Sequence, residues 1–416
     1  MINYLTFVGK NASKAFRSKI STDLKNKVLN KFSQLIKKNK KKIINQNKKD
    51  IKFAKKLGLK KNMIDRLKIN NDKLDEIIES VRKIAKLKDP TDKILSKWRR
   101  PNGLIIKRVT VPIGVVAVIY ESRPNVTSDI SSLCFKSGNC VILRGGSEAY
   151  FSNKLIAELF RNALSKYNIN KNYVQFIKSR DRKLVDMILS KMENYIDVVI
   201  PRGGKNLVKK VQKISSVPVI GHLEGICHTY IDKDANLDIA KKIVLNAKLR
   251  NTSICGATET ILFHEKNLNK YVNPVLAELV KNGCLIYSDK KIKKIFKGKS
   301  RNANQKSWST EYLSSKVSVK SVKNVSEAIM HINKYGTMHT DAIISKNKKT
   351  AKYFLKNVKS SIAIHNSSTQ FADGGEFGFG GEVGISTNKL PPRGPVGLNQ
   401  LVTYKYEVLG TGQIRK

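Results

Sequence analysis

The sequence predicts an α/β protein with two open, doubly wound parallel sheets. Two separate stretches alternate between short apolar runs and amphipathic segments, which is typical of parallel strands joined by crossover helices. At 416 residues the chain is long for one hydrophobic core, so we expect about two domains. A hydrophobic content of 40% is ample for burial in both.

The first 93 residues predict amphipathic helices with solvated outer faces. Apolar residues recur at helical spacing among lysines, as at Leu24, Val28, Phe32 and Leu35. A mitochondrial transit peptide would be Arg-rich, whereas here the Lys enrichment continues far past any cleavage point. We therefore expect no targeting segment.

Residues 94–110 predict a β-hairpin. Two strand-like runs flank Pro101, Asn102 and Gly103, and Asn-Gly is a strong indication of a tight hairpin turn. A hairpin between helical and α/β regions cannot bury itself. We expect it to pair with another subunit or with a distant strand, such as 401–408.

The first α/β series follows the hairpin. It predicts strands at 114–120, 140–143, 174–177 and 197–200, with helices near 128–135, 150–165 and 182–192. Sheets of this kind bind ligands at the carboxyl ends of their strands. Two such ends combine an arginine with glycines, at Arg144, Gly145, Gly146 and Ser147 and at Arg202, Gly203 and Gly204.

Both Arg-Gly segments are candidate anion sites for a dinucleotide. Glycines permit close backbone approach, the following helix offers N–H groups, and arginine supplies a fixed positive fork. Taken singly, each segment could also be an ordinary tight turn. No GxGxxG sequence occurs in this region, so a conventional dinucleotide-binding fold is not supported.

The second series contains the candidate nucleophile. It predicts strands at 260–264, 284–288, 316–322, 341–345 and 361–365, with helices at 238–249, 271–281, 325–335 and 349–358. Cys255 lies between the first helix and the first strand of the series, in NTSICGATET. A thiolate at such a junction is a good nucleophile, although a single cysteine is often a small buried hydrophobe. Two successive sheets predict a cleft with Cys255 near its floor, closed by the glycine-rich tail from residue 371, which leads to a last strand.

The remaining composition limits the class of protein. The cysteines are odd in number, form no CxxC pair and follow no visible signal peptide, so we expect reduced thiols in the cytoplasm. The longest apolar run, 109–120, is too short to span a membrane. The net charge is +48, but 64 of the 80 basic residues are Lys, and Arg is the better residue for phosphate and base recognition. We expect compositional drift rather than specific nucleic-acid binding.

Motifs along most of the chain resemble one family. They are VPIGVVAVIYESRPNVTSD from Val111, KSGNCVILRGGSEA from Lys136, PRGGKNLV from Pro201, GICHTYID from Gly225, the Cys255 segment, TEYL from Thr310, YGTMHTDAI from Tyr335, and the tail through GEVGIST to PPRGPVGL. In this order they resemble the gamma-glutamyl phosphate reductases (glutamate-5-semialdehyde dehydrogenases) of the aldehyde dehydrogenase superfamily.

The resemblance implies NADPH-dependent reduction of L-glutamyl 5-phosphate to L-glutamate 5-semialdehyde and phosphate, the second step from glutamate to proline. Cys255 would form a thioester that a hydride then reduces. Asn125 would stabilise the oxyanion, although it could instead only cap a helix that begins near Ser128. Glu311 would contact the ribose next to the nicotinamide, and Arg144 the adenosine ribose.

Two departures from the family pattern concern the same site. Glu224 lies near the position of the general base of hydrolytic aldehyde dehydrogenases, and such a base would waste the acyl-enzyme as free glutamate. We expect Glu224 to be a structural or surface polar residue. Gly256, Ala257 and Thr258 differ from the Asn-containing sequence of the family, which affects local geometry rather than the nucleophile.

Three residues before and in the GICHTYID segment are of types that bind metals. His222, Cys227 and His228 are ligand types without a fourth ligand at the usual spacing, so we expect no metal. The resemblance implies an NADPH-binding domain at 1–93 and 111–229, a catalytic domain at 230–395, and a β oligomerisation arm at 94–110 and 396–416. We expect a homo-oligomer, with functional pairing to glutamate 5-kinase.

Two alternatives stay open on the sequence alone. One is an NAD-dependent aldehyde dehydrogenase that hydrolyses its acyl-enzyme with Glu224 as base. The other is a basic nucleic-acid-binding protein without catalysis, whose binding would depend steeply on salt and would not need Cys255.

Overall fold

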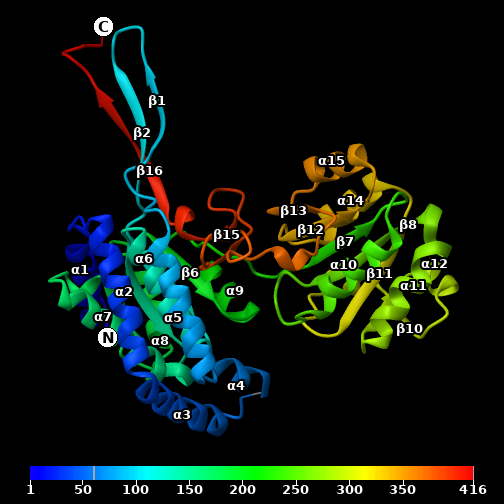
Figure 1. Cartoon of the computed structure of the whole chain (residues 1–416), viewed down its shortest axis with the longest axis horizontal. Helices are drawn as coiled ribbons and strands as arrows, with labels where there is room; N and C mark the ends of the chain where they lie inside the picture. The colour runs from blue at the N-terminus through cyan, green and yellow to red at the C-terminus, as the bar shows by residue number, and fades with distance from the viewer. Residues whose placement is uncertain (60, 416) are drawn as a thin grey trace. The chain divides into compact units, whose positions relative to one another are not determined.

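The computed structural model describes residues 1–59 and 61–415, with only the main chain at residue 62. It separates into two compact units (Figure 1). Unit 1 comprises Met1–Gly221, Gly378–Gly384 and the chain from Pro395 onward, and unit 2 comprises His222–Phe377 and Ile385–Gly394.

Unit 1 is built on a four-stranded parallel sheet in the order β5-β4-β3-β6. Its strands are β3 (Val115–Tyr120), β4 (Cys140–Gly145), β5 (Val174–Phe176) and β6 (Val198–Arg202). Every residue of β3 and β4 is buried, which explains why both read as continuous apolar runs and not as alternating ones. The strand order reverses between β3 and β6, which makes their carboxyl ends the topological switch point of the sheet.

Nine helices of unit 1 accompany this sheet within the described residues. They are α1 (Ile2–Phe16), α2 (Thr22–Lys38), α3 (Lys40–Lys56), α4 (Lys61–Leu67), α5 (Asn71–Lys86), α6 (Pro124–Lys136), α7 (Tyr150–Lys166), α8 (Lys183–Lys191) and α9 (Lys205–Ile214). Side-chain caps fix the N-termini of α2 and α5. The Ser21 side chain accepts the Leu24 N–H, and the Asn70 side chain accepts the Lys73 N–H. The sheet and the buried faces of most of these helices form one continuous apolar core, and Ala54 of α3, Leu67 of α4 and Ala149 form a smaller separate cluster.

A separate antiparallel sheet in the order β1-β2-β16 forms an arm of unit 1. Its strands are β1 (Ile94–Arg99), β2 (Ile105–Pro112) and β16 (Val402–Leu409). The turn contains Gly103 at φ +89°, a conformation that glycine adopts without strain. The hairpin prediction is confirmed, and so is its pairing with a distant C-terminal strand.

Unit 2 contains a seven-stranded parallel sheet in the order β10-β9-β11-β8-β7-β12-β13. Its strands are β7 (Cys227–Ile231), β8 (Thr258–His264), β9 (Leu285–Ser288), β10 (Ser300–Asn302), β11 (Lys316–Val322), β12 (Thr340–Ile344) and β13 (Ile362–His365). Its helices are α10 (Leu237–Leu249), α11 (Leu268–Lys281), α12 (Lys290–Ile295), α13 (Gln305–Trp308), α14 (Val325–Tyr335) and α15 (Lys348–Asn357). Two apolar clusters fill this unit. In the tail, β14 (Gly384–Ser386) and β15 (Gly394–Val396) form a two-stranded ladder.

The predicted fold class is confirmed, since both units are parallel α/β structures. The helix expected near Ser128 is wrong at its start, because α6 begins at Pro124. Proline is favoured in the first turn of a helix, where its missing N–H removes no hydrogen bond. The buried strand β7 is not among the predicted strands, and the helix α9 was expected after Gly204 without bounds.

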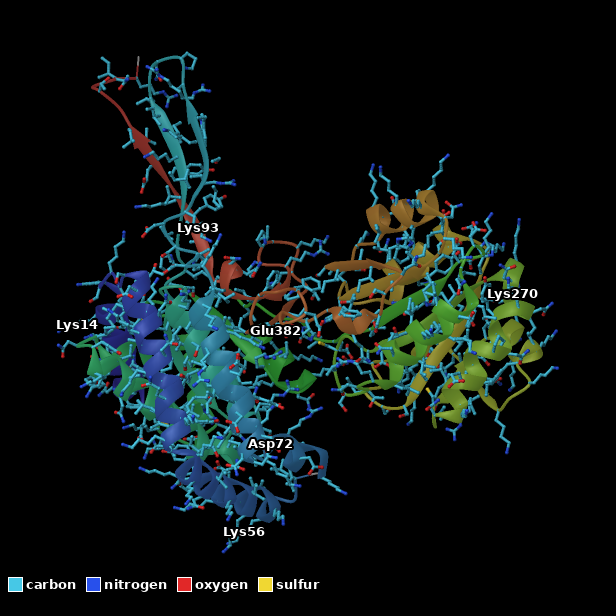
Figure 2. All side chains as sticks on the ribbon, in the orientation of Figure 1. Lys14, Lys56, Asp72, Lys93, Lys270 and Glu382 are labelled. Atoms are coloured by element: carbon cyan, nitrogen blue, oxygen red, sulfur yellow. The ribbon has the colours of Figure 1, made fainter. Side chains whose placement is uncertain are left out.

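Charge is distributed over both units. Figure 2 shows Lys14, Lys56 and Lys93 of unit 1 and Lys270 of unit 2 pointing outward, and all four are exposed. Among the described residues, no helix is both long and apolar enough to cross a membrane.

Candidate active site and nucleotide-binding edge

Cys255 lies in a turn between α10 and β8. Of the five cysteines it is the only one that is not buried, while Cys134, Cys140, Cys227 and Cys284 are enclosed in the core. No disulfide involves any of the five. The thiol at residue 255 is therefore the one best placed to meet a substrate.

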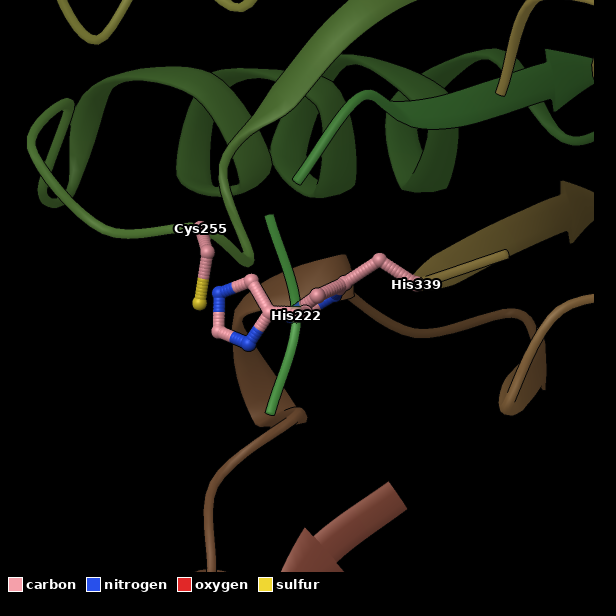
Figure 3. A group of neighbouring side chains, drawn as sticks. All are labelled: His222, Cys255 and His339. Carbon is pink, nitrogen blue, oxygen red and sulfur yellow. The ribbon is translucent and has the colours of Figure 1, made fainter. Parts of the chain in front are cut away.

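Two imidazoles lie beside the Cys255 thiol. A ring nitrogen of His222, a ring nitrogen of His339 and Cys255 Sγ all lie within 4.8 Å of one another (Figure 3). The two rings contact each other edge to face, with centroids 4.8 Å apart. His222 Nδ1 is 2.8 Å from the Ile385 carbonyl oxygen, and Figure 3 shows the opposite nitrogen of that ring facing the sulfur.

The sheet topology explains why these three residues meet. His222 precedes β7, Cys255 precedes β8 and His339 precedes β12, and these strands are adjacent and parallel in the order β8-β7-β12. Residues that precede neighbouring parallel strands lie at the same edge of the sheet. The cluster therefore occupies the amino edge of the unit 2 sheet.

The backbone around Cys255 is tightly fixed by Gly225. A Cβ atom at residue 225 would lie 2.1 Å from the Cys255 carbonyl oxygen and 2.7 Å from Cys255 Cα, so only glycine fits. The Gly225 N–H donates to Glu311 Oε1 at 2.8 Å. Cys227 Sγ donates to the Cys255 carbonyl at 3.1 Å. Glu311 thus holds the loop against which the Cys255 turn packs.

Gln370 fixes the opposite side of the turn. Its Nε2 donates to the Ala247 carbonyl at 2.9 Å, and its Oε1 accepts from Arg250 Nε at 2.8 Å. These contacts join the end of α10 to the tail and leave the Cys255 turn little freedom.

A buried ion pair joins the two elements that flank the turn. Lys248 Nζ of α10 lies 2.5 Å from Glu259 Oε2 of β8, and both side chains are fully buried. Glu259 Oε1 also accepts the Leu313 N–H at 3.2 Å. Burial raises the pKa of the Glu259 carboxyl to about 7, although the Lys248 ammonium opposes this.

Of the residues first considered as metal ligands, only His222 belongs to the cluster. His228 Nδ1 lies 2.8 Å from Asp341 Oδ1 in the interior, and both side chains are buried. Cys227 is buried, and its Sγ contacts the Cys255 carbonyl and His339 Nδ1. Glu224 is half-buried in the same loop as His222.

The carboxyl edge of the unit 1 sheet contains the predicted glycine segments. Arg202 is the last residue of β6. Gly203 and Gly204 follow it, are exposed, and connect β6 to α9. The Gly204 N–H donates to Glu121 Oε2 at 2.8 Å, and a Cβ at residue 203 would lie 2.5 Å from the same oxygen. A carboxylate of the chain itself therefore occupies the start of α9, where a phosphate was expected.

Arginines surround that carboxylate. Burial raises the pKa of Glu121, and the charges of Arg123 and Arg182 oppose the rise. Arg202 Nη2 lies 3.8 Å from Glu382 Oε1 in the tail segment of unit 1. The edge thus presents both carboxylate and guanidinium groups at the topological switch point.

Arg144 is directed inward. It is 5% exposed, and its Nη1 and Nη2 donate to the carbonyls of Gly145, Arg180 and Asp181. Burial lowers the pKa of its guanidinium. Arg144 therefore orders the 180–181 loop instead of presenting an open fork to an anion.

The two glycines at the end of β4 are tightly packed. A Cβ at Gly145 would lie 2.3 Å from Asn153 Nδ2, and one at Gly146 would lie 2.1 Å from Glu148 Oε1. Ser147 begins a short 3₁₀ turn and is half-buried.

Asn125 lies in the first turn of α6 in unit 1. Its Nδ2 donates to Asp129 Oδ2 at 3.2 Å, and its side chain makes no cap because the capping position is Arg123. The alternative in which Asn125 caps a helix is therefore wrong.

Comparisons with known proteins agree with this architecture. Residues 7–284 match the Aldehyde dehydrogenase family. The chain is 44% identical over 410 residues to a gamma-glutamyl phosphate reductase of Brucella suis biovar 1 (strain 1330), covering 98% of this chain and 97% of the relative. It is 46% identical over 395 residues to one from Bartonella tribocorum (strain CIP 105476 / IBS 506), covering 95% and 96%.

A solved structure is also similar over its full length. The crystal structure of gamma-glutamyl phosphate reductase from Thermotoga maritima superimposes with a TM-score of 0.96 at 39% identity, covering 99% of this chain and all of that chain.

Proposed function

Because the chain belongs to the aldehyde dehydrogenase family, and within it to the gamma-glutamyl phosphate reductases, we propose that Cys255 is the nucleophile of that reductase reaction. The protein is an oxidoreductase of proline biosynthesis that acts on gamma-glutamyl phosphate. The observation that supports Cys255 is its position as the one accessible thiol in a rigidly held turn.

The reaction divides into two steps at this sulfur. The Cys255 thiolate attacks the acyl carbon, the bond to the phosphate oxygen breaks, and phosphate leaves with that electron pair. Reduction of the resulting thioester breaks the carbon to sulfur bond, which releases glutamate 5-semialdehyde and regenerates the thiolate. A bound nicotinamide dinucleotide supplies the hydride for this second step.

Asn125 is the proposed oxyanion donor. Its Nδ2 is a hydrogen-bond donor in the first turn of α6, and the Asp129 carboxylate fixes its orientation. A donor of this kind contributes roughly 3 kcal/mol to stabilisation of the tetrahedral intermediate.

The residues at the carboxyl edge of the unit 1 sheet fit a nicotinamide dinucleotide. The edge lies at the switch point, where Gly203 and Gly204 are exposed and the Glu121 carboxylate accepts the Gly204 N–H. The charges of Arg123 and Arg182 suit a phosphate, so we propose NADPH as the preferred cofactor. Arg202 would contact the dinucleotide directly, and Arg144, Gly145, Gly146 and Ser147 would shape the adjoining loop.

Glu311 is the proposed contact of the nicotinamide ribose. Its Oε1 accepts the Gly225 N–H, which fixes the carboxylate beside the loop that packs on Cys255, and a carboxylate accepts hydrogen bonds from hydroxyl groups such as those of a ribose. Glu311 would thereby couple cofactor binding to the loop that packs on Cys255.

The proposed domain roles follow the same division. Residues 1–93 and 111–229 would bind NADPH, 230–395 would carry the nucleophile, and 94–110 with 396–416 would form the oligomerisation arm. Exposed apolar side chains on that arm support a homo-oligomer. They are Ile94, Leu95, Trp98, Tyr404, Tyr406 and Val408. The edge strands of the arm, β1 and β16, would pair with another copy of the chain.

We also place the enzyme in the cytoplasm, in functional pairing with a glutamate 5-kinase. The acyl phosphate that Cys255 attacks must come from a kinase reaction, so proximity of the two enzymes would limit loss of the substrate to hydrolysis.

The test is an NADPH oxidation assay with gamma-glutamyl phosphate made in situ by a glutamate kinase. Cys255→Ser should lower the rate by several orders of magnitude while NADPH binding persists, and Cys284→Ser, a buried thiol, should retain activity. A fully active Cys255→Ser variant would refute the covalent mechanism. The Glu224→Gln variant tests the hydrolytic alternative, because that reaction needs the Glu224 carboxylate as base and yields free glutamate. Repetition with NADH measures the cofactor preference.

A further inference from the structure

The cluster of His222, Cys255 and His339 has the composition of a metal site. One thiolate and two imidazoles form the ligand set that Zn²⁺ and similar borderline-soft divalent cations prefer. The three candidate ligand atoms lie within 4.8 Å of one another, and the site is empty.

The distances lie close to those of a bound ion. Tetrahedral zinc with Zn–S of about 2.3 Å and Zn–N of about 2.0 Å places its ligand atoms roughly 3.3 to 3.6 Å apart. Side-chain rotations that shorten the present separations by about 1 Å would close the cluster on an ion. The half-buried positions of His222 and Cys255 leave a path for its entry.

Both imidazoles are held in the way that ligating histidines are held. Metal-bound histidines usually bond an oxygen through the ring nitrogen that faces away from the metal. His222 Nδ1 lies 2.8 Å from the Ile385 carbonyl oxygen, and His339 Nδ1 lies 2.9 Å from Thr340 Oγ1. Figure 3 shows the other nitrogen of the His222 ring, Nε2, facing the Cys255 sulfur, and in His339 the nitrogen that is not bonded to Thr340 is Nε2.

His339 provides an independent indication. Its side chain is fully buried, and its Nε2 has no hydrogen-bond partner within the described part of the chain. A buried polar atom without a partner costs free energy, and a bound cation would remove that cost. His331 and His228 also have buried Nε2 atoms without partners, but neither ring adjoins an accessible thiol.

We propose that His222, Cys255 and His339 form a three-ligand inhibitory site for a divalent cation of the zinc class. Binding releases the thiol proton and forms a metal to sulfur bond, and water fills the fourth position. The sulfur electron pair that would attack the acyl carbon is then engaged by the metal. Reversible metal binding at this site thus switches off the nucleophile of the proposed function.

The test measures metal binding directly. Equilibrium dialysis of the full chain against chelator-buffered Zn²⁺ should give one ion per chain. Cd²⁺ should produce a thiolate-to-metal charge-transfer band, and Zn²⁺ should protect one thiol from iodoacetamide until a chelator is added. Zn²⁺ should also inhibit NADPH oxidation reversibly.

Variants assign the ligands. Cys255→Ser, His222→Ala and His339→Gln should each weaken Zn²⁺ binding by more than about 100-fold, because loss of even an outer-shell partner costs 10- to 100-fold. His365→Ala is the matched control, since this unit 2 histidine bonds the Ser345 carbonyl away from the cluster and should bind Zn²⁺ like the unchanged protein. Circular dichroism establishes that each variant is folded, and His222→Asn replaces His222→Ala if the latter is not.

Absence of stoichiometric binding, or a folded ligand variant that binds Zn²⁺ as tightly as the unchanged protein, would overturn the inference. These outcomes are separate from the proposed function. If the protein binds Zn²⁺ but its Cys255→Ser variant reduces the substrate at the normal rate, only the role of Cys255 as nucleophile is refuted. If the enzyme is active but does not bind Zn²⁺, only the metal site is refuted.

Discussion

Replacing Gly225 by alanine should inactivate the enzyme without altering any reacting group. The added methyl group would lie 2.1 Å from the Cys255 carbonyl oxygen and 2.7 Å from Cys255 Cα, whereas ordinary contact begins at 3.4 Å. Because all of these neighbours are backbone atoms, no flexible side chain can move aside. The Cys255 turn must therefore shift by about 1 Å.

A shift of this size has a defined consequence. A misplacement of about 1 Å at a reacting group costs roughly 100-fold in rate. Overpacking of this kind also costs about 1 to 3 kcal/mol of stability. We expect kcat/KM to fall about 100-fold in the NADPH oxidation assay, with a Tm lower by several degrees.

Gly256→Ala is the matched control. Its methyl group would meet the Thr369 carbonyl oxygen at 3.2 Å, which a movement of a few tenths of an ångström relieves. This variant should retain most of the activity although it is adjacent to the nucleophile. A Gly225→Ala enzyme with normal kcat/KM would show that Cys255 does not need the position described above.

Three further predictions concern stability and the oxyanion. Lys248→Met should lower the free energy of unfolding in urea by about 3 to 5 kcal/mol, because the Glu259 carboxylate is left buried without its cation, and adding Glu259→Leu should recover most of the loss. The pKa of His331 is lowered by burial to about 2, so below pH 6.5 the unfolded chain takes up a proton that the folded chain does not. Stability should fall by about 1.4 kcal/mol per pH unit below that value, and His331→Phe should flatten the slope between pH 6 and 4 in urea unfolding; equal slopes would contradict this origin. Asn125→Ala should lower kcat about 100-fold with unchanged NADPH affinity, and a loss confined to KM would exclude the oxyanion role.

Much of the fold could be predicted because the relevant signals are local. Continuous apolar runs such as 115–120 and the Asn-Gly turn at Gly103 depend only on neighbouring residues. The strand β7 was not identified, because Cys227, His228 and Thr229 are polar or small and its burial depends on the sheet around it. The start of α6 was missed although Pro124 is a recognised helix-start residue.

The candidate site was only partly predictable for the same reason. Cys255 stands out locally, and the family resemblance adds a role for it. His339 lies in a quoted motif but received no chemical role, since its proximity to Cys255 results from the order β8-β7-β12. Likewise, pattern alone could not show that Glu121 occupies the start of α9 or that Arg144 turns inward.

The arm has a consequence for how the protein is made. Its third strand, β16, pairs with β2, and Gln413 bonds the Asn102 carbonyl from 311 positions away in the chain. During translation the β1-β2 hairpin leaves the ribosome long before β16 exists, so one edge of the hairpin has no partner strand until β16 emerges. Unpaired edges of this kind invite association with other nascent chains. Completion of the arm therefore has to wait until β16 has been translated, and slow translation of the residues between β2 and β16 would prolong the period of greatest vulnerability to aggregation.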